Sequence, residues 1–299
     1  KVDFDDFHLG KIINDSRVGR SVGRLIFEGS GFNTKTMNSS LFVQLEDFIF
    51  SNKTYQNVDL VLHKQSNNYK FSFNTNDRDL KMRGQGVYIH QRSPQLEAEI
   101  ALNHANLKAM NFSKDSLAFS LNSKISISHF LKSGLIGTVI LDDFQILNKG
   151  ESIIFDPINI SMDTTKFNRI KIKNSIFNVS ASGDFPLYNF IYDWMADVNF
   201  YKDKLNFNKK NLEHRSLNDY ELKLKLNLED LGNIGMLTKL DRELGGGLSI
   251  DLTYQRGISF TGNIFTDSLK IDSLRFLENQ MEFDFSLNHS NPIEGQMAL

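Results

Sequence analysis

The sequence predicts an all-β fold: a long, curled, U-shaped antiparallel sheet with a few short helices. Apolar and polar residues alternate with a period of two along most of the chain, short polar turns separate the alternating runs, and helical periodicity is rare. Clean alternation is typical of antiparallel strands with one apolar face and one face in water. About 20 such runs can be counted, and at about 4.8 Å per strand an open sheet would be about 100 Å long.

Composition narrows the possible functions. The 299 residues suggest two domains by length, but only 4 Pro and no Gly/Ser linker mark a boundary, so we expect one continuous curled sheet over 1–299. The net charge of −2 gives no electrostatic footprint for nucleic acid. No Cys is present, which excludes disulfides and thiolate chemistry. No apolar run approaches the roughly 20 residues of a transmembrane helix. The sequence lacks a signal peptide and alternates from its first residues, so we expect an excerpt of a longer protein.

Along the chain, three apolar helical turns interrupt the alternating strands. The clearest alternating runs place one set of side chains on a shared face: Phe71, Phe73, Leu117, Phe119 and Leu121. The helical turns begin at Leu9, Leu107 and Leu231, and their unequal spacing excludes a solenoid of fixed period. It allows modules that start near residues 5, 104 and 228.

The second half contains one predicted helix and the most regular strands. Leu187, Phe190, Ile191 and Trp194 recur at helical spacing, which predicts a short helix over 186–196. Beyond it, alternation predicts a second set of side chains on one face: Leu222, Leu224, Leu226, Leu228, Leu248, Ile250, Leu252, Phe283, Phe285 and Leu287. Four intervening charged residues should face water: Lys223, Lys225, Asp251 and Asp284.

One motif resembles a catalytic site. Residues 19–23 read GRSVG, which fits the G-x-S-x-G nucleophile elbow with Ser21 as the nucleophile. That elbow needs a strand before the serine and a helix after it, whereas here the order is reversed. We therefore expect Ser21 in a loop or at a helix–strand junction, without a histidine contact. The seven His are scattered without metal-ligand spacing. We expect no enzyme activity, no cofactor and no metal.

A one-layer sheet of this length must cover its apolar face, because large exposed apolar patches are rare. Three arrangements would do so: a β-sandwich or adhesin-like stalk filled by protein, an outer-membrane β-barrel, or a U-shaped groove that holds lipid. A barrel favours Trp and Tyr at its rims, yet the chain has 1 Trp and 25 Phe, most of them within strands. The composition therefore favours the groove, lined by the two sets of side chains named above.

Three segments resemble the TamB-like proteins of the AsmA superfamily from Bacteroidota-type bacteria. They are FHLGKIINDSRVGRSVGRLIFEGSGF, LNHANLKAMNFSKDSLAFS and IKIKNSIFNVSASGDF. The resemblance implies a curled "β-taco" that bridges the periplasm and carries phospholipid between the inner and outer membranes. A role in outer-membrane protein assembly is also implied. The partners expected are phospholipid acyl chains, an outer-membrane barrel bound through a missing C-terminal domain, and the inner membrane reached through a missing N-terminal helix.

Overall fold

The computed structural model is almost entirely β-structure. Its strands are antiparallel and form an open, curled sheet, which confirms the predicted fold class. Helical backbone in the described residues is confined to Gly10 and Lys11, and the helix predicted over 186–196 lies outside them. The structure describes residues 1–8, 10–11, 14–31, 37–114, 116–131, 134–148, 151–185, 220–229, 244–255, 259–271, 274–286 and 294–298.

The chain divides into two compact units, Lys1–Ser161 (unit 1) and Met162–Leu299 (unit 2). The module starts near residues 5, 104 and 228 stay predictions. Unit 1 contains β1 (Val2–His8), β2 (Val18–Ser30), β3 (Asn38–Phe50), β4 (Lys53–Gln65), β5 (Asn68–Asn76), β6 (Leu80–Ile89), β7 (Gln95–Asn106), β8 (Leu117–Leu131), β9 (Gly134–Asn148) and β10 (Glu151–Ile154). Strand β11 (Ile158–Asp163) contains the boundary.

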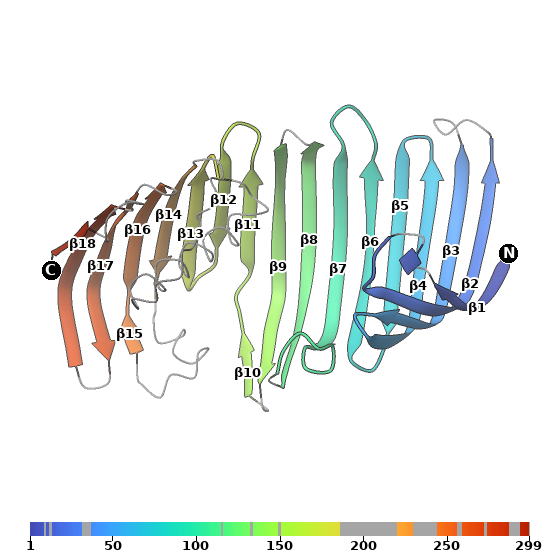
Figure 1. Ribbon diagram of the computed structural model, residues 1–299, viewed down its shortest axis with the longest axis horizontal. Helices are drawn as coiled ribbons and strands as arrows, with labels where there is room; N and C mark the ends of the chain where they lie inside the picture. Colours follow the sequence, from blue (N-terminus) through green and yellow to red (C-terminus); the bar gives the residue numbers. More distant parts are fainter. Residues whose placement is uncertain are drawn as a thin grey trace, which may run out of the picture. The chain divides into compact units, whose positions relative to one another are not determined.

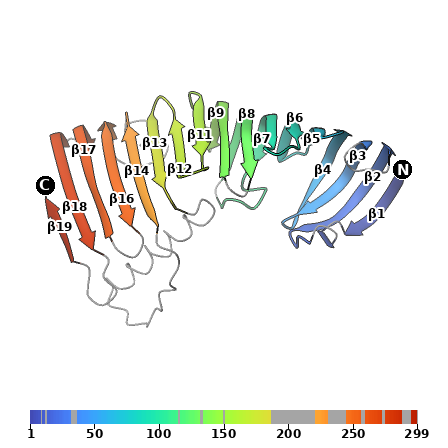
Figure 2. The ribbon, with the colours of Figure 1, turned by 90° about the horizontal axis from the view of Figure 1, so that it is seen from above.

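Unit 1 is an antiparallel meander in which each strand from β1 to β9 pairs with the next (Figures 1 and 2). The β3–β4 turn shows how local chemistry fixes the register. Ser51 and Asn52 have φ of 49° and 65°. Two positive φ angles are typical of a two-residue type I′ turn, whose twist matches that of the flanking strands.

Strands β1 to β9 share a line of pairing interruptions that we call the crease. It follows one row of paired residues across the sheet: Phe4, Gly23, Leu45, Val58, Thr75, Met82, Leu102 and Leu121. Next to this row the register shifts in several pairs of strands, and Asp6, Asn57 and Asp143 adopt positive φ. Bulges increase twist and bend strands. The ends of the first strands beyond the crease accordingly turn across the sheet (Figure 1).

Asp77 lies where the backbone pairing of β4 with β5 ends, next to the crease. Its carboxylate accepts hydrogen bonds from the backbone N–H of Gln56, at 3.1 Å, and of Asp79, at 2.8 Å. Asp77 is buried, and these bonds satisfy it. The side chain thereby replaces the backbone pairing that the crease interrupts.

A hydrogen-bonded turn follows β7, where the sequence predicted a helical turn around Leu107 and Met110. The N–H of Met110 donates to the carbonyl of Asn106 at 3.0 Å, and the Asn106 side chain accepts from the N–H of Ala109 at 3.1 Å. The asparagine therefore caps this turn as it would cap a helix. The turn ends when Asn111 adopts a φ of 64°.

Unit 2 repeats the meander with β12 (Asn168–Lys173), β13 (Phe177–Gly183), β14 (Glu221–Leu228), β15 (Leu244–Gly246), β16 (Leu248–Gln255), β17 (Ser259–Ile271), β18 (Leu274–Ser286) and β19 (Glu294–Ala298). Strand β14 pairs with β13 on one side and β16 on the other. A small core cluster of Phe185, Tyr220, Leu222 and Tyr254 packs at one end of these strands.

Fully buried apolar side chains are few among the described residues, as a one-layer sheet requires. None of the described residues belongs to a helix long and apolar enough to cross a bilayer.

Candidate functional site

The apolar face of unit 1 consists of two rows of side chains that run across β2 to β9. We call them the open rows. The first is Leu25, Val43, Leu60, Phe73, Gly84, Ile100, Ser123 and Leu141; the second is Phe27, Leu41, Leu62, Phe71, Gly86, Ala98, Ile125 and Val139. Because paired residues point to the same side of a sheet, each row presents one continuous apolar strip.

Among the described residues, no second layer buries the open rows. Only the small side chains of Ala98 and Ser123 are buried, and the large apolar ones stay half-buried or exposed. Phe27 is 55% exposed. A soluble protein rarely leaves so continuous an apolar surface without a partner. The open rows are therefore the main candidate for a binding surface.

Phe71 and Phe73 fill the centre of the open rows by covering two glycines. Phe73 is paired with Gly84 and Phe71 with Gly86. A Cβ at Gly84 would lie 2.4 Å from the Phe73 ring, and one at Gly86 would lie 2.5 Å from the Phe71 ring. The rings thus lie over bare backbone and smooth the surface, a recognised use of aromatic residues beside strand glycines.

The other predicted residues of unit 1 lie at or beyond the crease. Leu121 belongs to the crease row, opposite Leu102. Phe119 pairs with Ala105 and Ile146, and Leu117 pairs with Asn148. All three predicted side chains are half-buried.

Unit 2 carries two apolar rows of its own. One row is Ile170, Ala181, Leu224, Leu252 and Gly262, and the other is Ile172, Val179, Leu226, Ile250 and Ile264. Leu224, Leu226, Ile250 and Leu252 were predicted to share this face. Leu222 pairs with Tyr254 in the core cluster, and Leu228 pairs with Leu248. The backbone of Phe283 and Phe285 lies in β18, and Leu287 lies outside the described residues.

The intervening residues of β14 point the other way, as the alternation predicts. Lys223 and Lys225 are exposed, whereas Leu224 and Leu226 are half-buried. The ammonium of Lys225 is 2.5 Å from the Asp251 carboxylate on the neighbouring strand. Such an exposed cross-strand pair adds little stability but keeps this face in water. That the apolar rows bind lipid stays a prediction.

A more enclosed hollow of about 280 Å³ lies at the creased end of unit 1. We call it the crease pocket. It is lined by Phe48, Phe50, Tyr55, Val58, Phe73, Asn74, Thr75, Leu80, Met82, Met110 and Phe112. These residues come from four strands and from the turn after β7. The crease brings them together, since it folds the ends of β3 and β4 toward the faces of β5 and β6.

Tyr55 shows that side chains at the crease pocket are more buried than those of the open rows. Tyr55 is 5% exposed, and Lys53 lies 5.9 Å from the centre of its ring while pairing with Asp79. Burial, together with the charges of Asp77 and Asp79, raises the pKa of the Tyr55 phenol. Desolvation disfavours the phenolate, so this position favours a neutral, dry contact.

Sequence patterns alone missed the crease pocket. The adjacent polar residues Glu46 and Asp47 shift the phase of alternation in β3, and Phe48, just beyond them, lines the hollow. Asn103 and His104 make a similar break in β7. Two consecutive polar residues inside an alternating run were the available signal, because a bulge inserts one extra residue.

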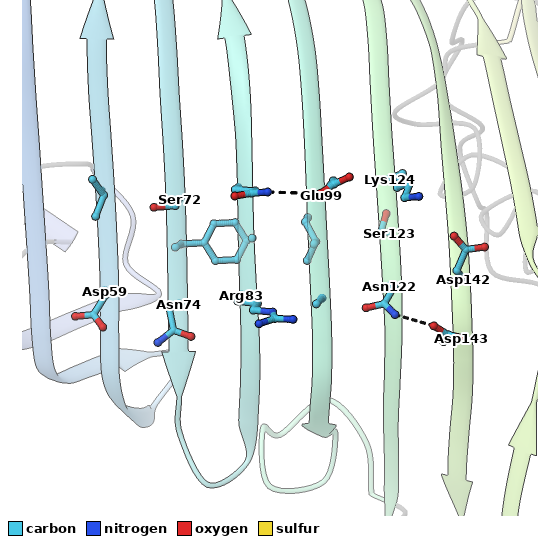
Figure 3. A pocket seen from close by; sticks show the side chains of 16 residues that line it. Asp59, Ser72, Asn74, Arg83, Glu99, Asn122, Ser123, Lys124, Asp142 and Asp143 are labelled. Carbon is cyan, nitrogen blue, oxygen red and sulfur yellow. Dashed lines mark hydrogen bonds between the residues drawn. The ribbon is translucent and has the colours of Figure 1, made fainter.

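The opposite face of unit 1 is polar and also hollowed (Figure 3). Its side chains include Asp59, Asn74, Arg83, Glu99, Asn122, Lys124, Asp142 and Asp143. Asn122 donates to Asp143 at 2.8 Å, and Gln85 donates to Glu99 at 3.5 Å. Acidic, basic and amide groups are interspersed on neighbouring strands. The described residues include no group of three or more His, Asp or Glu side chains placed to hold a metal ion.

The prediction for the position of Ser21 was wrong. Ser21 lies inside β2, opposite Phe7 and Phe48, and is 1% exposed. The strand begins at Val18 because β1 and β3 supply pairing on both sides. His8 pairs with Arg20, one residue away, but the Ser21 hydroxyl has no hydrogen-bond partner among the described residues. A buried serine without a base lacks the geometry of an activated nucleophile.

Comparisons with protein-family models, with curated proteins and with solved structures find no significant match to the chain. Function must therefore be inferred from the geometry of the chain itself.

Proposed function

We propose that this chain is a segment of a lipid conduit in which phospholipid acyl chains lie along the apolar face of the sheet. The observation that carries the proposal is the pair of open rows in unit 1. They cross eight strands, and no other described segment covers their large apolar side chains.

The chemistry of this surface favours hydrocarbon as its occupant. The open rows contain Leu, Ile, Val, Phe, Gly and Ala, with Ser123 as the single hydroxyl. Each methylene group that such a surface removes from water contributes about 0.8 kcal/mol. The rows offer no charged side chain that would fix an acyl chain at one position, so they suit movement along the face.

The setting follows from the sequence resemblance to TamB-like proteins. The full-length protein would bridge the periplasm of a Gram-negative bacterium, with an inner-membrane anchor and an outer-membrane barrel partner supplied by segments outside this chain. A contribution to outer-membrane protein assembly belongs to the same proposal. The role is one of binding and passage rather than catalysis.

Lipid that co-purifies with the chain tests the proposal. Organic extracts of the purified protein should contain phospholipid by mass spectrometry, and Leu226→Glu should reduce its amount while circular dichroism stays unchanged. An uncompensated charge on an apolar surface repels acyl chains. Lys225→Glu, on the opposite face, is the matched control and should retain lipid.

The alternative is a structural stalk whose apolar face is covered by protein alone. Absence of phospholipid from the extracts, together with unfolding of Leu226→Glu, would favour the stalk. A charge in a solid protein core would remove the strands, whereas a charge in a groove would not.

A further inference from the structure

The crease pocket differs from the open rows in being walled on several sides. Phe73, Thr75, Leu80 and Met82 come from β5 and β6, whereas Phe48, Phe50 and Tyr55 come from the folded ends of β3 and β4. Met110 and Phe112 come from the capped turn after β7. The accessible lining is entirely apolar. A ligand that fills the hollow must therefore be hydrocarbon where it contacts the protein.

The turn that supplies one wall is held by its own backbone. The N–H groups of Phe112 and Ser113 donate to the carbonyl of Leu107, at 2.8 and 3.2 Å. The N–H of Leu107 donates to the carbonyl of Leu117 at 2.8 Å. The wall is thus formed before any ligand binds, which reduces the entropy lost on binding.

The size of the hollow limits its occupant. The volume of about 280 Å³ lies just below the range of roughly 300–1,000 Å³ that is typical of pockets for drug-sized ligands. The hollow therefore accepts part of one acyl chain and is too small for a whole phospholipid.

The charged groups that border Tyr55 already have partners. Lys53 pairs with Asp79, and the Asp77 carboxylate accepts two backbone hydrogen bonds. Lys53 is therefore engaged, and the negative charge that Asp77 keeps disfavours a phosphate or a carboxylate headgroup beside Tyr55. The methyl end of a chain suits the hollow better than its ester end.

We propose that the crease pocket binds the methyl end of one phospholipid acyl chain. This makes it a retention site beside the open rows along which chains pass, with Phe73 common to both. The inference rests on the proposed function only in taking a phospholipid as the source of the chain.

Site-specific fluorescence quenching tests this, because the chain contains no cysteine and one can be introduced at will. Phe112→Cys places a bimane label at the pocket, at a residue that is 61% exposed. Phe27→Cys is the matched control on the second open row, at 55% exposure. The probes are phosphatidylcholines that carry a nitroxide either at the methyl end of the acyl chain or next to the ester.

The pocket predicts stronger quenching at Phe112→Cys by the methyl-end nitroxide than by the ester-side nitroxide, and equal quenching by the two probes at Phe27→Cys. Val58→Phe narrows the hollow and should weaken quenching at Phe112→Cys about tenfold, equivalent to about 1.4 kcal/mol. Val139→Phe makes the same change in an open row and should leave the quenching at Phe112→Cys unaltered.

The outcomes separate the two proposals. The pocket proposal is overturned if both probes quench equally at Phe112→Cys. It is also overturned if quenching occurs at Phe27→Cys and not at Phe112→Cys. In either case the proposed conduit is not contradicted. Quenching at Phe112→Cys alone supports the pocket and contradicts passage along the open rows. Quenching by a nitroxide-labelled free fatty acid but not by the phospholipids overturns phospholipid as the source. The preference between the two probes needs no variant of Val58, so the test survives if Val58→Phe fails to fold.

Discussion

The open rows and the crease row cross mostly the same strands, yet their side chains have different environments. Leu41 and Leu45 lie four residues apart on one face of β3. Leu41 is half-buried in an open row, whereas Leu45 is 8% exposed in the crease row. The residues themselves are equally apolar. The difference arises from the pairing interruptions, which fold one end of the sheet and leave the other end open.

The comparison teaches that burial in this one-layer sheet is produced by bending rather than by a second layer. A bulge costs little backbone energy but redirects every residue beyond it. The apolar side chains of the open rows remain available to a ligand, whereas the buried side chains of the crease row, such as Leu45, stabilise the fold. Substitutions in the two regions should therefore affect different measurements.

The largest expected effect is that of a charge at the crease. Leu45→Glu should unfold unit 1 or lower its stability by several kcal/mol, since the carboxylate would be buried without a partner. Leu41→Glu should keep the β-sheet signal in circular dichroism and a urea midpoint close to that of the original chain. If both variants unfold alike, the open rows are a protein core and the comparison fails.

Two glycine substitutions test whether the rings of Phe71 and Phe73 pack on the backbone of Gly86 and Gly84. In Gly86→Ala the new Cβ would meet the Glu97 carbonyl oxygen at 2.6 Å as well as the Phe71 ring, so we expect a loss of about 2 kcal/mol. In Gly84→Ala the nearest atoms belong to the Phe73 ring, which can turn aside, and we expect about 1 kcal/mol. Urea unfolding measures both. A larger loss for Gly84→Ala would contradict the described contacts.

Alkaline pH should lower the stability of the protein by ionising Tyr55 in the crease pocket. The pKa of Tyr55 is raised above its ordinary value of 10.0, chiefly by burial. Its contribution to stability is fully present below pH 10 and is lost as the pH rises through the higher pKa of the folded state. Tyr55→Phe should reduce that loss. An unchanged alkaline unfolding profile in the variant would show that Tyr55 is not buried.

The smallest effect is expected at Ser21. Its buried hydroxyl has no hydrogen-bond partner among the described residues, so Ser21→Ala should be neutral or stabilising by up to about 1 kcal/mol. The urea midpoint checks this. Covalent labelling of Ser21 by a fluorophosphonate would instead reveal an activated nucleophile and contradict its placement in β2.

Strand existence and the facing of side chains could be predicted from the sequence because alternation is a local signal. Leu224 and Leu226 face one way and Lys225 the other within a single strand, so no distant contact is needed to assign them. The same holds for Phe71 and Phe73, which lie in the open rows as part of the predicted face.

The crease and its pocket could not be predicted in this way. Whether Phe48 meets Met110 depends on how far several bulges bend the strands, and bulge geometry is set by pairing partners distant in sequence. The match between Phe73 and Gly84 depends likewise on the register of the β5–β6 hairpin. Ser21 was misplaced for the same reason, since pairing by β1 and β3 extended a strand that its own residues did not mark.

Photo-crosslinking on β14 tests the central claim most directly. A benzophenone amino acid replaces either Leu226 or Lys225, which are adjacent and point to opposite faces, and the protein is irradiated with radiolabelled phospholipid vesicles. The conduit predicts phospholipid adducts at Leu226 and none at Lys225. Equal labelling at the two positions, or labelling at neither, would contradict the assignment of the apolar face to acyl chains.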